Sequence, residues 1–275
     1  MIKYILEICG EVNAVEEYRA EIAAHLTAPR QHWQVFRSVD STNSLAKDMA
    51  LQGAPDGTVL IADSQTAGRG RLGRSFQSRA GLGLYLSILW RPEGTAQDLL
   101  PLPALGAVAA VRVVRRLCGV RAQIKWPNDL VLEGKKIAGI LTESVLLGDE
   151  LAVVLGIGIN VSHRAGDFAG EVRHMAASLE MVTGKPVSRG AVAAALIEEL
   201  DVLRREALHN PAAWLDEYRT RCLTLGREVR VVAGDTERHG LALAVDEGYG
   251  LRVRWEDGSE ETVRAGEVSV RGPCR

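Results

Sequence analysis

Arginines and glycines are concentrated in the segment Gln65–Arg74, which reads QTAGRGRLGR. Between Ser64 and Arg79 the chain has four arginines and no acidic residue, although its overall charge is nearly balanced. Glycine lets a backbone approach a ligand closely, and the guanidinium fork binds phosphate or carboxylate through paired hydrogen bonds. The segment therefore predicts a flexible anion-binding loop, with an ordinary solvated basic loop as the alternative.

The same segment also matches a dinucleotide-binding fingerprint, Gly68-x-Gly70-x-x-Gly73. In that fingerprint a helix begins at the glycines. Ser75–Ala80 is instead polar and irregular, and Gly81 leads toward an expected strand. The spacing therefore argues against a dinucleotide-binding βαβ unit.

A second segment with chemical potential is KWPND at Lys125–Asp129, followed by KKIAG at Lys135–Gly139. Asn-Asp favours a turn, and Glu133-Gly134 is typical of a two-residue hairpin turn. Such a hairpin returns Lys136 toward Asp129, and a lysine and a carboxylate held together can neutralise an anion and orient or accept a proton. The alternative is a turn and an exposed hairpin tip with ordinary lysines.

Two further segments combine small and polar residues. In LGIGIN at Leu155–Asn160, the alternation of a strand places Gly156, Gly158 and Asn160 on one face. Two alternating glycines indicate a close approach to that face, either by a flat ligand or by a packed helix. The segment DSTN at Asp40–Asn43 precedes a helical pattern, so its side chains either cap the helix or bind a polar, uncharged group.

The elements that must position these segments alternate between strands and helices. The pattern predicts an α+β (α/β layered) domain over residues 32–222, with a mixed sheet and flanking helices. Residues 1–31 predict an N-terminal extension with one helix, and residues 223–275 predict a small β-barrel of short strands separated by glycine turns. The expected strands lie near Trp33–Arg37, Thr58–Asp63, Leu82–Trp90 and Ala152–Asn160, with a hairpin over Ile124–Glu143. One expected helix begins at Ser41. The other expected helices cover Ala104–Cys118, Arg189–His209 and Pro211–Arg221.

Composition excludes several classes of protein. The 275 residues include 33 basic and 35 acidic side chains, and a net charge of −2 argues against a protein that coats nucleic acid. The four cysteines are far apart and form no Cys-x-x-Cys pair, which is typical of free thiols in a reducing compartment. The apolar stretch Leu99–Val111 is shorter than the roughly 20 residues that a membrane span needs. We therefore expect a cytoplasmic protein with no membrane or nucleic-acid partner and no metal site made by the protein alone.

Together, the order and spacing of these motifs resemble those of the biotin protein ligases. The resemblance runs from about residue 33 to Glu267-Val268-Ser269, and its motifs are Asp40–Asn43, Gln65–Arg71, Lys125–Asp129, Lys136–Leu141 and Gly156–Asn160. It implies an SH3-like fold for the C-terminal barrel. It also implies an enzyme that activates biotin with ATP to biotinyl-5′-AMP, with release of pyrophosphate. Biotin would then pass to one lysine of a biotin carboxyl carrier domain of acetyl-CoA carboxylase or a related carboxylase, with Mg²⁺ expected alongside ATP.

The resemblance further implies roles for individual residues. Lys136 would touch the reacting carboxylate, Asp129 would orient or deprotonate the acceptor lysine, and Arg69 and Arg71 would complete the catalytic set. The residues expected to bind biotin are Ser41, Thr42, Asn43, Gln65, Gly68, Arg69, Arg71, Lys136, Gly139 and Gly156. The residues expected to bind ATP are Arg71, Arg74, Phe76, Lys125, Asn128 and Asn160.

Elementary electrostatics agrees with this assignment. A carboxylate brought to about 4 Å from a triphosphate is repelled by roughly 4 kcal/mol per charge pair at an effective dielectric constant near 20. The loop arginines and Lys136 would offset that repulsion.

This sequence departs from the family pattern in two places. Phe76 stands where many members have a tryptophan that would face adenine. Residues 1–31 are too few for a winged-helix repressor domain, which predicts the monofunctional type, and the family also implies a homodimer. A lipoate or octanoate ligase and a non-catalytic biotin-sensing regulator are the alternative functions.

Overall fold

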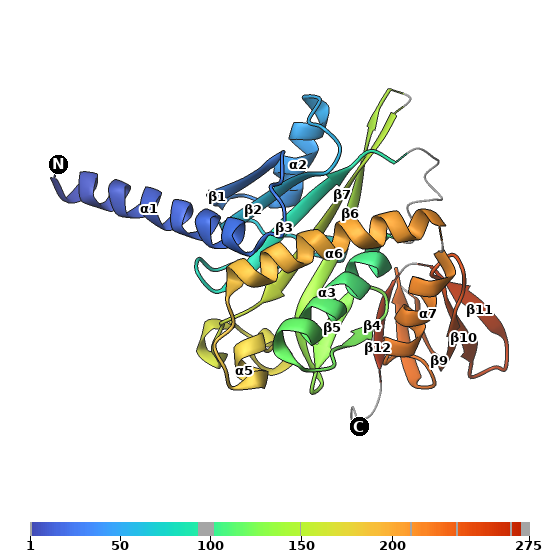
Figure 1. Ribbon diagram of the computed structural model, residues 1–275. Coiled ribbons are helices and arrows are strands. Elements are labelled where there is room, and N and C mark those ends of the chain that lie inside the picture. The colour runs from blue at the N-terminus through green and yellow to red at the C-terminus, as the bar shows by residue number, and fades with distance from the viewer. Residues whose placement is uncertain are drawn as a thin grey trace.

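A seven-stranded sheet forms the centre of the protein, and a five-stranded antiparallel sheet follows toward the C-terminus (Figure 1). The computed structural model describes residues 2–92, 102–148, 150–209, 211–234, 236–264 and 266–270, without the side chains of residues 2–12, 147, 207–209 and 211. In the larger sheet the order is β1-β2-β3-β7-β6-β5-β4; β1 and β2 run parallel, and the other neighbours run antiparallel. These strands are β1 (Trp33–Val39), β2 (Thr58–Gln65), β3 (Gly83–Trp90), β4 (Gln123–Lys125), β5 (Asp129–Leu132), β6 (Lys135–Leu147) and β7 (Glu150–Asn160).

Helices cover both faces of this sheet, as the expected α+β fold requires. On one face, α2 (Thr42–Leu51) begins with Ser41 as its N-cap. On the other face, α3 (Leu102–Cys118) approaches so closely that a methyl group at Gly106 would lie 3.2 Å from the side chains of Ile140 and Leu155. The remaining helices are α1 (Ile2–His25), α4 (Val172–Met175), α5 (Leu179–Thr183), α6 (Arg189–His209) and α7 (Pro211–Arg221), with 3₁₀ turns at Arg71–Gly73 and Ala165–Asp167. The mixed sheet with flanking helices is confirmed.

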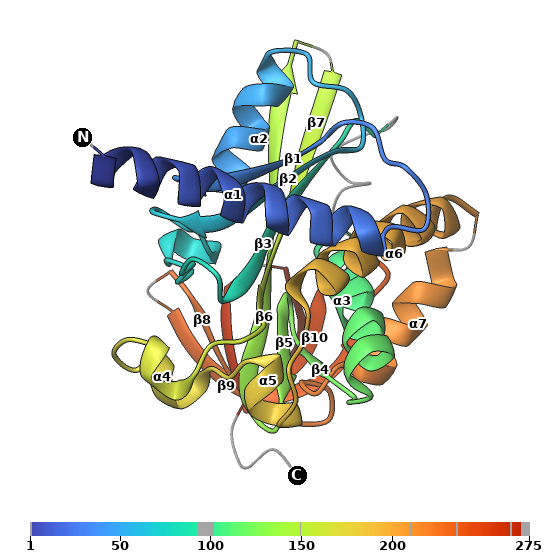
Figure 2. The ribbon, with the colours of Figure 1, turned by 60° about the vertical axis from the view of Figure 1, so that its left-hand side comes forward.

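The second half of α1 belongs to the folded body. Figures 1 and 2 show α1 crossing α6. Tyr18 and Ile22 are buried in the main core, and the Ser188 hydroxyl at the start of α6 donates a hydrogen bond to Glu21 (2.6 Å). A methyl group at Gly190 would lie 2.5 Å from the Glu21 side chain, so the two helices are in direct contact. The expected N-terminal helix therefore packs on the rest of the chain.

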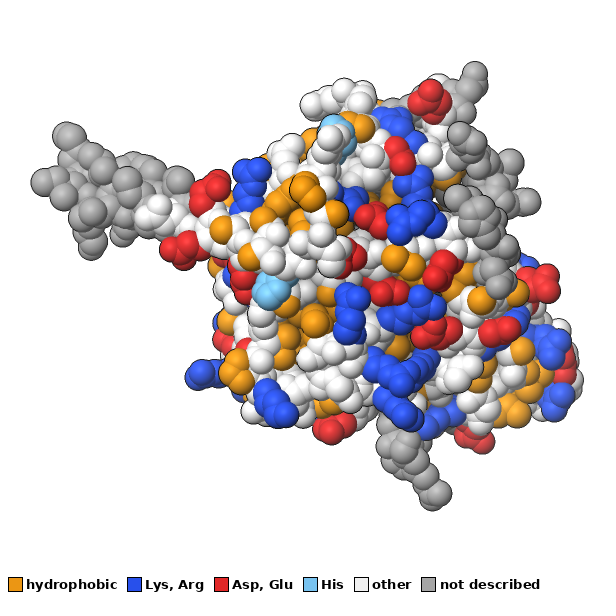
Figure 3. Space-filling view, viewed as in Figure 1, with side chains coloured by type: hydrophobic (Ala, Val, Ile, Leu, Met, Phe, Trp, Pro, Cys, Tyr) orange, Lys and Arg blue, Asp and Glu red, His pale blue; other side chains and the backbone are white. Residues whose placement is uncertain are grey.

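The helices α3, α6 and α7 are joined to one another by ion pairs. Arg112 of α3 contacts Glu199 (3.0 Å) and Glu206 (3.5 Å) of α6 and Glu217 of α7 (2.8 Å). Figure 3 shows basic and acidic side chains intermixed over the face that these helices cover, without a field of a single sign. The Arg112 cluster therefore connects three helices without making this face strongly basic.

The five-stranded sheet has the order β11-β10-β9-β8-β12. Trp126 connects it to the main sheet, because its indole N–H donates to the Tyr249 carbonyl (2.9 Å) and its backbone N–H donates to the Thr224 hydroxyl (3.0 Å). The Tyr218 hydroxyl of α7 donates to the Pro127 carbonyl (3.0 Å) beside this junction. The second sheet fits the expected C-terminal β domain, while the domain boundaries at residues 31 and 222 stay predictions. Its strands are β8 (Glu228–Ala233), β9 (Thr236–Val245), β10 (Leu251–Trp255), β11 (Glu260–Val263) and β12 (Glu267–Val270).

Two composition-based expectations concern cysteines and membranes. Cys118 and Cys222 are free thiols, whereas the side chains of Cys9 and Cys274 lie outside the described residues. Among the helices of the described ranges, none is long and apolar enough to cross a membrane.

Candidate functional site

A cavity of about 160 Å³ lies between the α2 face of the main sheet, the arginine-rich loop and the edge of the C-terminal sheet. It brings together every predicted site residue except Gly68 and Asn160. The predicted residues that line it are Ser41, Thr42, Asn43, Gln65, Arg69, Arg71, Arg74, Phe76, Lys125, Asn128, Asp129, Lys136, Gly139 and Gly156. The individual roles implied for these residues stay predictions.

The arginine-rich loop folds back on itself. Isolated antiparallel bridges pair Gln65 with Ser78 and Arg69 with Ser75, and the Phe76 N–H donates to the Gly68 carbonyl (2.8 Å). A methyl group at Gly68 would overlap the Phe76 carbonyl, so this glycine is required by loop packing and does not face the cavity. Between Gly68 and β3 the only helical turn is the three-residue 3₁₀ turn Arg71–Gly73, which agrees with the argument against a dinucleotide-binding unit.

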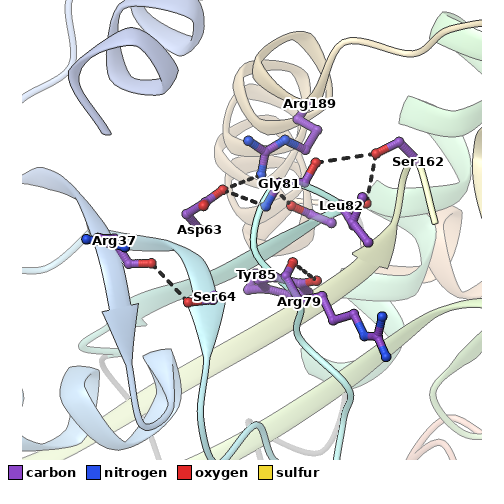
Figure 4. A network of polar contacts seen from close by, with 10 residues as sticks. Arg37, Asp63, Ser64, Arg79, Gly81, Leu82, Tyr85, Ser162 and Arg189 are labelled. Carbon is purple, nitrogen blue, oxygen red and sulfur yellow. Dashed lines mark hydrogen bonds and ion pairs between the residues drawn. The ribbon is translucent and has the colours of Figure 1, made fainter. Parts of the chain in front are cut away.

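A polar network fixes the end of this loop (Figure 4). The Asp63 carboxylate accepts hydrogen bonds from the Gly81 N–H (3.0 Å) and from the Arg189 guanidinium (2.6 Å) at the start of α6. The Tyr85 hydroxyl donates to the Arg79 carbonyl (3.0 Å). The loop therefore enters β3 at a fixed place, with Arg189 also stacked 4.2 Å from the Tyr18 ring of α1.

Lys136 and Asp129 form an ion pair of 2.7 Å, as the hairpin prediction required. The turn consists of Glu133 and Gly134, both at positive φ (50° and 77°). A β-bulge on β6 inserts Ile137, because Lys136 pairs with Val131 while Ala138 pairs with Leu130. A bulge shifts the alternation by one residue, so Lys136 points to the same face as Gly139 and Asp129.

Glycines on β6 and β7 form the floor of the cavity. Gly139 pairs with Gly158, and Leu141 pairs with Gly156. A methyl group at Gly156 would overlap the Asn43 side chain, so α2 packs directly on this strand. At Gly156 the close approach is therefore made by a helix, which is one of the two alternatives that the sequence left open.

Phe76 makes the corresponding close approach at Gly158. A methyl group at Gly158 would lie 2.6 Å from its ring, which also has Lys136 Nζ 5.9 Å from its centroid and Tyr85 edge-on at 6.3 Å between centroids. The Phe76 ring therefore lies over the glycine floor, and stacking on adenine stays a prediction.

Short polar side chains extend the floor under α2. The buried Ser87 hydroxyl of β3 lies 2.7 Å from the Thr42 hydroxyl and 2.6 Å from Asn43 Oδ1. The Gln65 carbonyl accepts from the Thr42 N–H (2.8 Å), and the Gln65 amide donates to the Ser78 hydroxyl (2.8 Å). Since these groups bond to one another, they present oriented donors and acceptors to an uncharged polar ligand.

Protein acceptors hold the three loop arginines in the structure. Arg69 contacts Glu143 of β6 (3.4 Å), and Arg71 donates to Asn128 Oδ1 and to the Gly266 carbonyl (3.4 Å each). Arg74 forms an ion pair with Glu267 of β12. Burial lowers the pKa of the Arg71 guanidinium, because it disfavours the charged form. An anion bound beside Arg71 would stabilise that charged form.

The two remaining predicted residues lie at the margin of the site. Asn160 ends β7 on the same face as the floor glycines, but its amide is buried and donates to the Ala177 carbonyl (3.1 Å). Gly68 lies in the loop turn described above.

Sequence motifs do not reveal the acidic partners of the arginines or the part of the cavity wall that the C-terminal sheet contributes. Glu143 and Glu267 had no local motif, and Gly266 and Val268 line the cavity from the C-terminal sheet. Ser87 lay inside an apolar strand. Strand alternation from Gly156 and Tyr85 could have placed Ser87 on the polar face.

Acidic groups in the site are not arranged as a metal cage. Within the described parts of the chain, no three His, Cys, Asp or Glu side chains gather closely enough to hold a metal ion. Asp129 and Glu267 already pair with basic side chains. A magnesium ion bound mainly by substrate phosphates fits such a site, because Mg²⁺ keeps several waters and needs few protein ligands.

Comparisons with known proteins agree on one family. Residues 35–160 match the biotin/lipoate A/B protein ligase family. The bifunctional ligase/repressor BirA of Bacillus subtilis is 33% identical over 239 residues, which cover 86% of this chain and 73% of that protein. The chain belongs to the biotin/lipoate A/B protein ligase family. A biotin--[acetyl-CoA-carboxylase] ligase of Paracoccus denitrificans, another relative, is 33% identical over 248 residues, or 85% of this chain and 98% of that protein.

Structural comparison supports the same membership of the biotin/lipoate A/B protein ligase family. The biotin protein ligase from Aquifex aeolicus in complex with biotin and ATP superposes with a TM-score of 0.76 and 30% identity, covering 88% of this chain and 99% of that one. These relatives confirm the resemblance to biotin protein ligases and the α+β fold. None of the named relatives favours a lipoate ligase or a non-catalytic sensor.

Proposed function

We propose that this chain is a biotin protein ligase. In the first step, a carboxylate oxygen of biotin bonds to the α-phosphorus of ATP, and the bond to pyrophosphate breaks. In the second step, the amine of a carrier lysine bonds to the activated carbonyl, AMP leaves, and the amine loses a proton. Biotin and ATP are both bound in the Aquifex aeolicus relative, and carboxylase is the substrate named for the Paracoccus denitrificans relative.

The observation that carries the proposal is the Lys136–Asp129 pair opposite the arginine-rich loop in one cavity. Two substrates that are both anions repel each other, so a site for their reaction needs several cations. Lys136 and the three arginines supply four, and their protein acceptors hold them close to the cavity. Preorganised cations stabilise the charge that develops on the α-phosphate without reorganising in the transition state.

Asp129 gives the second step a proton acceptor. Its carboxylate lines the cavity and is held by Lys136, so it can orient the amine of the carrier lysine and take its proton. The polar floor made by Thr42, Gln65 and Asn43 suits the uncharged ring system of biotin. Mg²⁺, when bound with ATP, would neutralise phosphate charge beside Asn128 and Arg71.

The test is a transfer assay with the purified full-length chain, biotin, Mg-ATP and the biotin carboxyl carrier domain of acetyl-CoA carboxylase. The expected result is a carrier mass increased by one biotinyl group. The increase should be absent without ATP and absent when the target lysine is replaced. Pyrophosphate release without carrier modification would assign the chain to adenylation of biotin alone. If neither pyrophosphate release nor carrier modification is detected, the proposal is overturned.

We also propose that the chain forms a homodimer through the free edge of β6. Strand β5 pairs with β6 only as far as Gly139, and beyond it no described strand borders β6 on that side. An unpaired edge presents backbone donors and acceptors that a second copy can pair with. Light scattering should show a dimer at micromolar concentration, whereas a monomer throughout would contradict this. The cytoplasmic location stays a prediction.

A further inference from the structure

Glu143 connects the arginine-rich loop to the floor of the cavity. It extends from β6 on the same face as Gly139, because residues two apart on a strand share a face. Its carboxylate accepts a hydrogen bond from the Asn43 amide (2.9 Å), and it contacts Lys47 Nζ (2.8 Å) and Arg69 Nη2 (3.4 Å). The side chain is 17% exposed, so Glu143 is a largely buried carboxylate with three donors from two other segments.

The three contacts differ in strength. Lys47 and Asn43 belong to the same helix, α2, and bind the two carboxylate oxygens at short distances. Arg69 is the most distant of the three, and its side chain is 48% exposed. Lys47 already balances the carboxylate charge, so Arg69 can leave without stranding a buried charge. Arg69 is therefore the exchangeable partner of a fixed carboxylate.

We propose that Glu143 is a positioning residue for Arg69, holding this guanidinium at the cavity until the anionic substrate takes it over. The inference rests on the proposed ligase function. A long, flexible arginine side chain loses rotamer freedom when it binds a ligand, and this loss opposes binding. Glu143 meets part of that cost in the free enzyme, because it confines Arg69 next to the site. A substrate anion then offers a bidentate contact in exchange for one long ion pair.

Glu143→Gln tests the proposal, because the amide keeps the side chain's shape and removes its charge. Initial rates of pyrophosphate release should show a KM increased roughly three- to tenfold, since the ordering cost of one side chain falls on binding. The value of kcat should stay within about twofold, as expected for lost ground-state binding. An increase in the KM for biotin assigns Arg69 to the carboxylate, and an increase for ATP assigns it to the phosphates. An unchanged KM for both overturns the proposal.

A double-mutant cycle separates positioning from general damage. Without the guanidinium Glu143 has nothing to position, so Arg69→Met with Glu143→Gln should have the KM of Arg69→Met alone, within about twofold. If the two substitutions instead raise KM independently, so that their effects multiply, Glu143 acts through Lys47 or through the stability of the fold. Glu143→Asp keeps the charge and should restore much of the wild-type KM.

The matched control is Glu150→Gln, which removes an exposed carboxylate at the start of the neighbouring strand β7. It should leave KM unchanged and thereby exclude a general effect of charge. Thermal unfolding of each variant reports any loss of structure separately. The wild-type protein is assayed first, and if it releases no pyrophosphate the ligase function is refuted. If the wild type is active but the two substitutions change KM independently, only the role of Glu143 is refuted.

Discussion

At the scale of single residues, the charge of Lys136 is balanced before any substrate arrives. Asp129 pairs with it at 2.7 Å, and the pair is only partly exposed. Under the proposed mechanism, an incoming carboxylate would compete with Asp129 for the ammonium group, and Asp129 would then be free to accept a proton. One pair would thus supply the cation for the first step and the base for the second.

This division of labour makes a sharp prediction for Lys136→Ala. Losing a cation beside the developing charge should reduce adenylate formation by at least about a hundredfold, as for other preorganised electrostatic groups. Lys135→Ala is the matched control, since its exposed side chain lies one residue away and points to the other face. Single-turnover formation of biotinyl-5′-AMP measures both variants, and a near-normal yield from Lys136→Ala would remove this lysine from its role.

His163 makes a second prediction, about pH. Its ring is buried and stacked on Phe168 (5.1 Å between centroids). Burial lowers its pKa to about 4, so the native state holds it neutral while the unfolded chain protonates near pH 6.5. Stability should therefore fall as pH drops from 6.5 toward 4, by about 2 kcal/mol between pH 7 and pH 5.

Urea unfolding of His163→Phe measures this contribution, because phenylalanine keeps the stack and cannot titrate. The variant should lose about 2 kcal/mol less than wild type between pH 7 and pH 5. The exposed His174 provides the control, and His174→Gln should keep the wild-type pH dependence. Equal pH dependence in wild type and His163→Phe would show that the ring titrates normally.

At the scale of elements, the site depends on local deviations from regular strands. The turn at Glu133-Gly134 was predictable, because its residue types favour the positive φ that a tight hairpin requires. The bulge at Ile137 was not, since an isoleucine in an apolar strand carries no local signal. Regular alternation would have placed Lys136 on the opposite face from Gly139, so the correct prediction of the ion pair depended on a feature that the sequence does not display.

The alternating glycines predicted a close approach but not what makes it. Asn43 at Gly156 and Phe76 at Gly158 are brought there by the packing of α2 and the loop, which a strand pattern cannot specify. Gly156→Ala should therefore destabilise the protein by about 1–3 kcal/mol, because the new methyl overlaps Asn43. Gly166→Ala, with open space at its Cβ, should change stability by less than about 0.5 kcal/mol. Equal urea midpoints for both variants would contradict tight packing at Gly156.

At the scale of the whole molecule, the site is assembled from distant parts of the chain. Arg74 meets Glu267, and Arg71 meets the Gly266 carbonyl, so the arginine-rich loop contacts the edge of the C-terminal sheet. Elements and motifs could be predicted because each is encoded within a few consecutive residues. Partners such as Glu143 and Glu267 could not, because an isolated glutamate in a strand looks the same whether it faces solvent or an arginine.

The N-terminal helix shows the same dependence on long-range contacts. Its sequence predicts one helix but not what that helix contacts, and the structure shows that its second half packs on the rest of the chain. Ile22 is completely buried, Tyr18 lies under Arg189, and Arg189 in turn holds Asp63 at the end of β2. Contacts run from α1 to Gly81, where the loop enters β3, so we predict that this helix unfolds together with the site.

Ile22→Ala tests this continuity. The truncation should lower the free energy of unfolding by about 2–5 kcal/mol, as for other buried isoleucines, because the cavity lies between α1 and the main core. If α1 and the site form one unit, helical circular dichroism and adenylate formation will be lost at the same reduced urea concentration. The exposed Glu17→Ala on the same helix should leave both midpoints in place. Early loss of helical signal with an unchanged activity midpoint would instead show that α1 unfolds independently of the seven-stranded sheet.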